Sequence, residues 1–277
     1  MTSSRPEDVP RLAMVNLGSG SSGNCTLLEA QCASHRCRIL IDCGFSLRRT
    51  RSHLDALGVP LESISGLVIT HFDRDHFNPV WAATLGRLDI PVHCAMEHQA
   101  AAAGAGLTDS QYQLYDDTLD LGCGLTAHPI RMAHDASGCW AYRFNFHDHS
   151  LGFATDLGHV PDELLTHFAG VDVFAIESNY DRAMQMESDR PEFLKRRIMD
   201  GSGHLSNEQS LHAVRSIAAT SDLTAIMLLH LSRQCNDPQL IHELYAACGP
   251  ELADRIVITR QFETTPWIEC RPQATPC

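Results

Sequence analysis

The sequence predicts a single α/β domain, and three observations support this fold class. Short apolar segments typical of strands alternate with amphipathic segments typical of helices along most of the chain. Histidine and acidic residues recur directly after the apolar segments, which is where open α/β sheets place their sites. The length of 277 residues and the hydrophobic content of 44% suffice for one large domain with a sizeable core.

The clearest of these strand ends lies near residue 70. Residues 66–69 are apolar and predict a buried strand, and residues 77–79 predict the start of a helix over 79–87. The loop between them contains four potential metal ligands: His71, Asp73, Asp75 and His76. Imidazole and carboxylate ligands together favour zinc, manganese or iron over calcium or magnesium. A polar surface loop with chance ligands is the alternative, but four ligands directly after an apolar strand favour a metal site.

The composition restricts the classes of function. The formal net charge of −13 argues against a uniformly basic surface that coats nucleic acid, but it permits a local basic groove. No apolar run is long enough to span a bilayer, and residues 1–11 lack the apolar core of a signal peptide. The eleven cysteines lack paired zinc-finger spacing, so we expect reduced thiols. These features predict a cytoplasmic protein without a membrane partner and leave the oligomeric state open.

Five further predicted strands are followed by a residue that can bind or orient a metal ion. The strands span residues 38–41, 125–132, 150–154, 171–176 and 223–229, and the residues after them are Asp42, His134, Asp156, Glu177 and His230. Asp42 has an alternative interpretation as a turn or capping residue. His147 and His149 form a similar pattern, but we expect them in a hairpin turn at the opposite end of the sheet.

Two other segments bear on substrate binding. Residues 18–24 form a Gly/Ser loop, which is usually a plain turn but whose backbone N–H groups can also bind an anion. Residues 46–57 predict an amphipathic helix with Arg48, Arg49 and Arg51 on its polar side. A solvated helix face is the favoured interpretation of these arginines, and contact with a polyanion is the alternative. Further helices are predicted over residues 97–103, 209–219 and 238–248.

Several motifs resemble a known family. Residues 70–76, T-H-F-D-R-D-H, resemble the T-H-x-H-x-D-H motif of the metallo-β-lactamase fold hydrolases, with Asp73 at the usual position of the second histidine. The segments S-G-S-S-G-N (19–24), E-S-N (177–179) and G-H-L-S-N-E (203–208) are similar to the YycJ-like (WalJ) subfamily. The resemblance implies a four-layer α+β fold, the αββα sandwich, with two mixed sheets and outer helices. It also implies one domain over residues 1–277 with its core at about 12–259.

The same resemblance implies a dinuclear metal centre. One divalent ion would be held by His71, Asp73 and His134. The other would be held by Asp75, His76 and His230, with Asp156 bridging the two. Asp42 would orient the metal loop through hydrogen bonds. The ions would be zinc or manganese, with iron as a further option, and would activate a shared hydroxide.

Beside these ligands, the resemblance implies a proton donor. By similarity to tRNA 3′-processing nucleases of the same fold, His204 would protonate the leaving group and Glu177 would orient it, with Asp75 completing the catalytic set. A role for His204 in capping the next helix is the alternative. The expected substrate contacts are Ser21, Ser22, Asn24, Arg74, Ser206 and the basic cluster at residues 195–197. Ser206 also fits a helix cap.

These expectations favour metal-dependent hydrolysis of a phosphodiester in nucleic acid, and the subfamily resemblance implies a DNA exonuclease. Hydrolysis of a small ester, thioester or cyclic phosphate is an alternative that needs no basic groove and suits the net charge of −13. A metal-binding protein that has lost catalysis is a third possibility, suggested by Asp73. His204 beside Glu177 argues against it, because a non-catalytic chain need not keep a proton donor.

Overall fold

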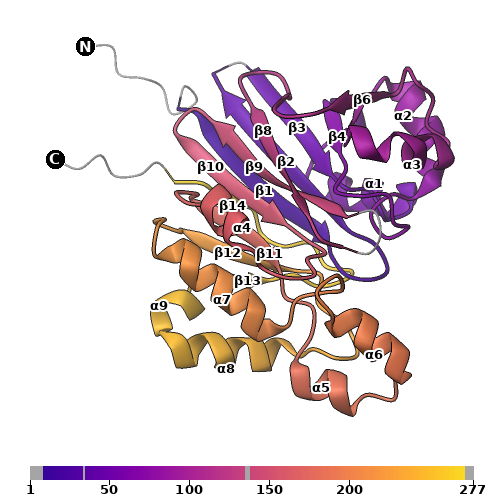
Figure 1. Ribbon diagram of the computed structural model, residues 1–277. Coiled ribbons are helices and arrows are strands. Elements are labelled where there is room, and N and C mark those ends of the chain that lie inside the picture. The colour runs from indigo at the N-terminus through magenta and orange to yellow at the C-terminus, as the bar shows by residue number, and fades with distance from the viewer. Residues whose placement is uncertain (1–8, 34, 135–137, 272–277) are drawn as a thin grey trace, which may run out of the picture.

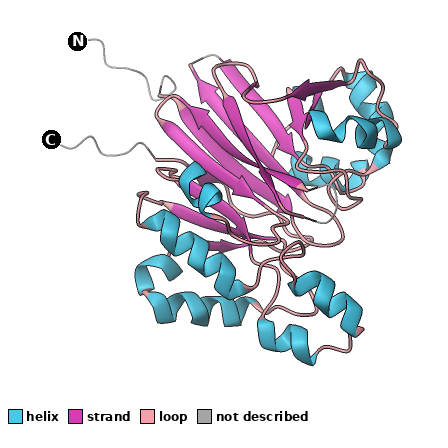
Figure 2. Ribbon diagram, viewed as in Figure 1, coloured by secondary structure: helices cyan, strands magenta, loops and turns pink. Residues whose placement is uncertain are grey.

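The structure is a computed structural model, and it describes residues 9–33, 35–134 and 138–271. Residues 1–8 of the N-terminal segment considered above lie outside this part. Within the described residues, the strands form two seven-stranded sheets that face each other, and helices lie on both outer sides (Figures 1 and 2). The predicted αββα sandwich is confirmed.

The first sheet has the strand order β14-β1-β2-β3-β4-β5-β6. Its strands are β1 (Arg11–Gly18), β2 (Cys25–Cys32), β3 (His35–Ile41), β4 (Gly66–Val68), β5 (Val92–Ala95), β6 (Tyr112–Tyr115) and β14 (Ile268–Glu269). Neighbours are antiparallel from β14 to β3 and parallel from β3 to β6. The outer face is covered by α1 (Leu47–Ala56), α2 (Ala82–Leu88) and α3 (Gln99–Gly104), with 3₁₀ turns at Leu61–Ser63, Pro79–Trp81 and Met96–His98.

The second sheet has the strand order β13-β12-β11-β10-β9-β8-β7. Its strands are β7 (Leu119–Asp120), β8 (Thr126–Met132), β9 (Cys139–Phe146), β10 (His149–Ala154), β11 (Val173–Glu177), β12 (Ala225–Leu229) and β13 (Ile256–Ile258). Its outer face is covered by α4 (Asp162–His167), α7 (Asn207–Ala218), α8 (Pro238–Cys248) and the short α9 (Pro250–Ala253). The pair α5 (Arg182–Glu187) and α6 (Glu192–Met199) lies apart from these helices, beyond one end of the sheet (Figure 1).

Both faces of each sheet are buried, and the strand sequences reflect this. In β1, Leu12 and Met14 pack between the two sheets, whereas Val15 and Leu17 pack under the helices. Successive side chains of a strand point to opposite faces, so a strand buried on both faces must be apolar throughout. This burial makes the sheets a rigid support for the residues at their ends.

The element boundaries differ from the predictions in two informative places. The helix predicted over residues 209–219 begins at Asn207, because Ser206 caps it and Gln209 completes a reciprocal capping box with Ser206. The predicted core ended near residue 259, but β14 at Ile268–Glu269 pairs with β1. The predicted hairpin is confirmed for His147, which lies in the turn between β9 and β10 with a φ of 51°, whereas His149 is buried as the first residue of β10.

Two further expectations concern composition. All ten cysteines in the described part of the chain are free thiols. None of the helices among the described residues combines the length and the apolar character that crossing a bilayer requires.

The packing at Gly44 generates a prediction. A Cβ added at Gly44 would lie 1.8 Å from the backbone oxygen of Asp75, so Gly44→Ala should displace the loop of metal-ligand candidates. We expect a loss of about 1–3 kcal/mol in unfolding free energy, measured by denaturant titration, together with reduced metal content. At Gly104, in α3, an added Cβ meets nothing within 4 Å, so Gly104→Ala should be neutral or slightly stabilising. Equal stability of the two variants would contradict this account of Gly44.

Candidate metal centre

The candidate ligands gather at one edge of the sandwich because the strands that precede them end there. Asp42 follows β3, the loop over residues 70–76 follows β4, and Asp156, Glu177 and His230 lie at the ends of β10, β11 and β12. Neighbouring strands β10, β11 and β12 are parallel, so their C-terminal ends meet at the same edge.

Three of these residues have an unusual backbone conformation. The φ angles of Asp42, Asp156 and His230 are 60°, 52° and 56°, which lie in the left-handed region that non-glycine residues rarely adopt. Each such residue costs on the order of 1 kcal/mol and persists only where its surroundings over-determine it. Their repetition at three strand ends indicates that the backbone turns sharply there to direct these side chains into one site.

Asp42 fixes the metal loop through hydrogen bonds. Its Oδ1 accepts the backbone N–H of Thr70 at 2.9 Å, and its Oδ2 lies 2.7 Å from Nδ1 of His76. Nε2 of His76 then lies 2.6 Å from Oδ2 of Asp156. A carboxylate that accepts from one ring nitrogen selects the tautomer whose other nitrogen can bind a metal. Asp42 therefore occupies the orienting position that the sequence analysis expected for it.

The described residues contain four overlapping groups that could hold a metal ion, with ligand atoms within 4.8 Å of one another. One group contains His71, Asp73 and His134, and another contains Asp75, His76 and His230. Asp156 belongs to the other two groups, one with His71 and His76 and one with Glu177, His204 and His230. It therefore lies between the group of His71 and the group of His76. The structure thus brings together all seven predicted metal ligands, in the two predicted sets.

The electrostatics of the site also fit bound cations. Asp42, Asp156 and Glu177 are buried, and within the described part of the chain their ion pairs are all with histidines. Burial by itself raises the pKa of Asp156, but His230 and His76 hold it well below its ordinary value. Buried carboxylates need compensating positive charge, and divalent cations bound by neutral imidazoles supply it. The donor set, imidazole nitrogen and carboxylate oxygen, is also one that zinc and manganese accept.

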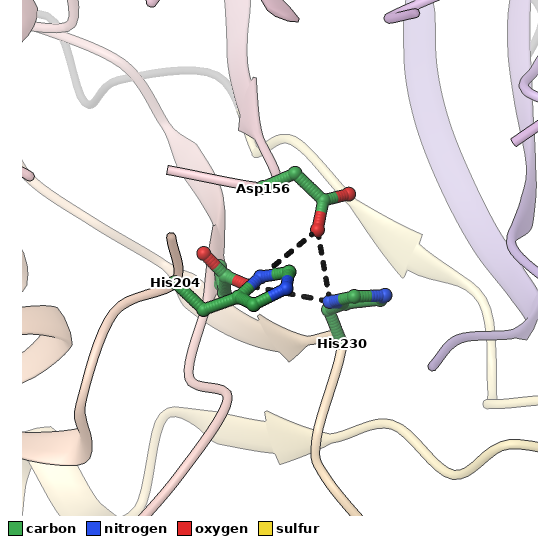
Figure 3. Close-up of side chains that lie close together, drawn as sticks. Asp156, His204 and His230 are labelled. Carbon is green, nitrogen blue, oxygen red and sulfur yellow. Dashed lines mark hydrogen bonds and ion pairs between the residues drawn. The ribbon is translucent and has the colours of Figure 1, made fainter. Parts of the chain in front are cut away.

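His204 and Glu177 form a pair that contacts the predicted ligands Asp156 and His230. Nδ1 of His204 lies 2.6 Å from Oε1 of Glu177. It also lies 3.1 Å from Oδ1 of Asp156, to which His230 points as well (Figure 3). Glu177 is held in turn by the backbone N–H groups of Leu157 and Leu205, at 2.8 and 3.2 Å from its Oε2. Burial lowers the pKa of His204, but Glu177 and Asp156 together hold it well above its ordinary value. The protonated imidazole is therefore favoured near neutral pH, which a proton donor requires.

A cavity of about 420 Å³ opens over these groups. Ser21 lines it and also lines an adjoining hollow of about 370 Å³, which Ser22, Arg74 and Asp75 share. A larger hollow of about 960 Å³ lies beside α2 and α3, but its only ionisable lining side chain among the described residues is Asp89. The cavity of about 420 Å³ over the metal-ligand groups is therefore the candidate active site.

Not all predicted substrate contacts reach this cavity. Asn24 is buried, where its side chain bonds to Ser19, Gly20 and the backbone oxygen of Asp75. Ser206 is buried at the start of α7, and its hydroxyl accepts the Gln209 N–H. The ammonium of Lys195 is also buried and donates to the backbone oxygen of Met186. These three side chains are committed to the fold, which corrects the expectation that they contact substrate.

The cavity wall includes residues that the sequence analysis did not identify. Arg190, Leu194 and Ile198, from the segment of α5 and α6, line it together with Gln234. Arg197, from the basic cluster predicted at residues 195–197, lines the cavity as well. The local sequence carries no signal for the other four, because a charged amphipathic segment is typical of a solvated helix.

Known proteins resemble this chain in sequence and in fold. The family described as the "Beta-lactamase superfamily domain" matches residues 37–230. The exodeoxyribonuclease YycJ of Bacillus anthracis is 27% identical over 230 residues, which cover 81% of this chain and 84% of the relative. The exodeoxyribonuclease WalJ of Streptococcus pneumoniae is 29% identical over 234 residues, which cover 82% of this chain and 84% of the relative. A crystal structure of a diphosphatase from the PhnP family shares the fold, with a TM-score of 0.64, 14% identity and coverage of 94% and 98%.

The αββα sandwich with imidazole and carboxylate groups gathered at one edge defines the class of this protein as a metal-dependent hydrolase. The matched domain extends over most of the chain, so the protein belongs to the β-lactamase superfamily domain family. The two exodeoxyribonuclease relatives confirm the resemblance to the YycJ-like subfamily.

Asp73 provides a test of the first ligand group. Its side chain is 58% exposed and lies 3.9 Å from Nε2 of His71, so it is the least enclosed of the candidate ligands. Asp73→Ala should lower the number of divalent ions bound per chain, because the group of His71, Asp73 and His134 loses a ligand. Asp73→His should keep the wild-type metal content. Metal analysis by plasma mass spectrometry checks this, with the exposed Asp117→Ala as control. Unchanged metal content in Asp73→Ala would show that Asp73 is not a ligand.

Proposed function

We propose that this hydrolase is a DNA exonuclease that uses two divalent metal ions, zinc or manganese. The observation that supports this most directly is the His204–Glu177 pair, which lies against Asp156 between the two ligand groups. A phosphodiester needs this combination, because its leaving alkoxide must be protonated. The names of the two relatives, both exodeoxyribonucleases, support DNA as the substrate.

In this proposal His71, Asp73 and His134 would hold one ion, and Asp75, His76 and His230 would hold the other. Asp156, which shares groups with both sets, would be a ligand common to the two. When bound, such ions supply Lewis acidity at the phosphoryl oxygens and acidify water near neutral pH. The protein contributes the positions of these ligands, which Asp42 and the buried strand ends hold in place.

The proton transfers of the reaction involve His204, Glu177 and Asp75. Water adds to phosphorus, the bond from phosphorus to the 3′-oxygen breaks, and His204 gives its proton to that oxygen. Glu177 keeps the His204 ring oriented and stabilises its positive charge. The Asp75 carboxylate is 27% exposed and lines the cavity, where it can accept a hydrogen bond from the attacking water, whose proton passes to solvent. Ser21, Ser22 and Arg74 line the route by which the DNA backbone reaches the centre.

Cleavage of DNA by the purified protein is the first test. With manganese or zinc, 5′-phosphorylated single- or double-stranded DNA should release mononucleotides stepwise, and His76→Ala should abolish release because it removes a ligand. Gel electrophoresis and chromatography of the products measure both. If metal-loaded protein cleaves no DNA but hydrolyses bis(p-nitrophenyl) phosphate, the substrate is a small phosphodiester and the exonuclease proposal is wrong.

The role of His204 has a sharper test. His204→Ala should lower kcat on DNA by about 10²–10⁴-fold. The loss on bis(p-nitrophenyl) phosphate should be far smaller, because p-nitrophenolate leaves without protonation. Metal content should be unchanged, and His212→Ala, an exposed histidine on α7, is the matched control. Equal losses on both substrates, or loss of metal, would contradict a proton-donor role.

A further inference from the structure

Two arginines converge on an exposed aromatic ring outside the active-site cavity. The guanidinium carbon of Arg49 lies 4.2 Å from the centre of the Phe262 ring, and Phe262 is 42% exposed. The guanidinium carbon of Arg233 lies 5.3 Å from the centre of the same ring. Arg49 belongs to α1, Arg233 follows β12, and Phe262 lies between β13 and β14. Three segments that are distant in sequence thus form one surface, the arginine patch of Arg49, Arg233 and Phe262.

The charges of the arginine patch have no acidic partner. Within the described residues, neither guanidinium donates a hydrogen bond or forms an ion pair with a carboxylate at 4.0 Å or less. Two neighbouring arginines differ, since Arg51 pairs with Glu62 at 3.7 Å and Arg260 pairs with Glu263 at 3.6 Å. An aromatic face attracts a guanidinium but accepts few of its N–H groups. The ring of Phe262 therefore positions both charges and leaves their donors for a ligand.

The arginine patch adjoins the candidate active site. Arg233 and Phe262 line a hollow of about 300 Å³, and Ser232 lines both this hollow and the cavity of about 420 Å³. Gln261, directly before Phe262, is buried, and its side-chain oxygen accepts the backbone N–H of Ser22 at 2.9 Å. Ser22 lines the hollow next to that cavity. A linear substrate that leaves the cavity on this side therefore reaches the patch directly.

The chemistry of the patch suits the backbone of a nucleic-acid strand. Such a strand presents phosphates and bases side by side, and guanidinium groups and aromatic side chains are the groups that bind them. A guanidinium is also weakly hydrated, so it loses little water when it contacts a phosphate. The net charge of −13 argues against a basic surface over the whole molecule, but it permits a local one of this kind.

Resting on the proposed function, we infer that the arginine patch binds the part of the DNA strand that extends outside the active-site cavity. Arg49 and Arg233 contact phosphates of that part, and Phe262 holds both guanidinium groups in place. The patch raises the affinity for long strands over short ones without contact to the reacting phosphate. In this interpretation the polar side of α1 has two roles, because Arg49 contacts the polyanion whereas Arg51 stays paired with Glu62.

The test compares the affinities for two lengths of single-stranded DNA. A dinucleotide contains only the linkage at the metal centre, whereas a strand of about 20 nucleotides also reaches the patch. The parent protein is the metal-loaded His204→Ala variant, because its slow turnover leaves the DNA intact while fluorescence anisotropy measures Kd. Adding Arg49→Met and Arg233→Met together should weaken binding of the long strand by about tenfold near physiological salt. The Kd of the dinucleotide, measured by competition, should stay unchanged.

The salt dependence of Kd is a second readout. The slope of log K against log salt concentration should fall by about 0.7 for each arginine removed, because fewer counterions leave a single strand on binding. Phe262→Ala should cause part of the loss in affinity although both charges remain. Arg215→Met, which removes an exposed arginine on α7, is the matched control and should keep the values of the parent. Thermal unfolding and metal content verify that each variant is folded.

The outcomes separate this inference from the proposed function. An unchanged Kd for the long strand in the double variant, an equal loss for both lengths, or a parent that does not bind the long strand would each overturn the inference. Where wild type still hydrolyses DNA, the exonuclease proposal stands in all three cases. Binding of the long strand through the patch by a wild-type protein that hydrolyses no DNA would overturn only the exonuclease proposal.

Discussion

The need to balance buried negative charge is the constraint on which the rest of the structure depends. Asp42, Asp156 and Glu177 are almost without solvent contact, and histidines are their charge partners among the described side chains. A carboxylate buried in this way is costly unless cations or hydrogen bonds compensate it. Metal ions satisfy this need and also supply the chemistry, so in this protein the stability of the centre and its activity have the same physical origin.

In the sandwich, the candidate ligands and part of the cavity wall come from different elements. The sheets, buried on both faces, hold the ligands at strand ends, and the left-handed backbone of Asp42, Asp156 and His230 directs them inward. The segment of α5 and α6 lies outside the layers and lines the cavity instead. The candidate ligands are thus on the rigid core, and part of the cavity wall is on a peripheral segment.

The exposed position of Asp73 shows how this division affects one ligand group. Asp75 and His76 lie in the same loop but are held by contacts to buried residues, whereas Asp73 is 58% exposed and its carboxylate lies 3.9 Å from Nε2 of His71. An exposed carboxylate in place of an imidazole makes the group of His71, Asp73 and His134 the more open of the two. Exchange of metal is therefore expected to be easier in that group.

The sequence by itself determined the fold class, because the alternation of apolar and amphipathic segments is a short-range pattern. The same pattern indicated that Asp42, Asp156 and His230 lie at strand ends, whereas the division of the ligands into two groups rested on the resemblance to a known family. Tertiary structure alone decided the rest. The two-residue strand β14 exists only through pairing with β1, and Asn24 is committed to hydrogen bonds that depend on the folded neighbourhood, such as the one to the backbone oxygen of Asp75. Arg190 acquires its place from Gln185, Ser232 and Gln234, two of which are more than 40 residues away along the chain, so no local pattern could reveal it.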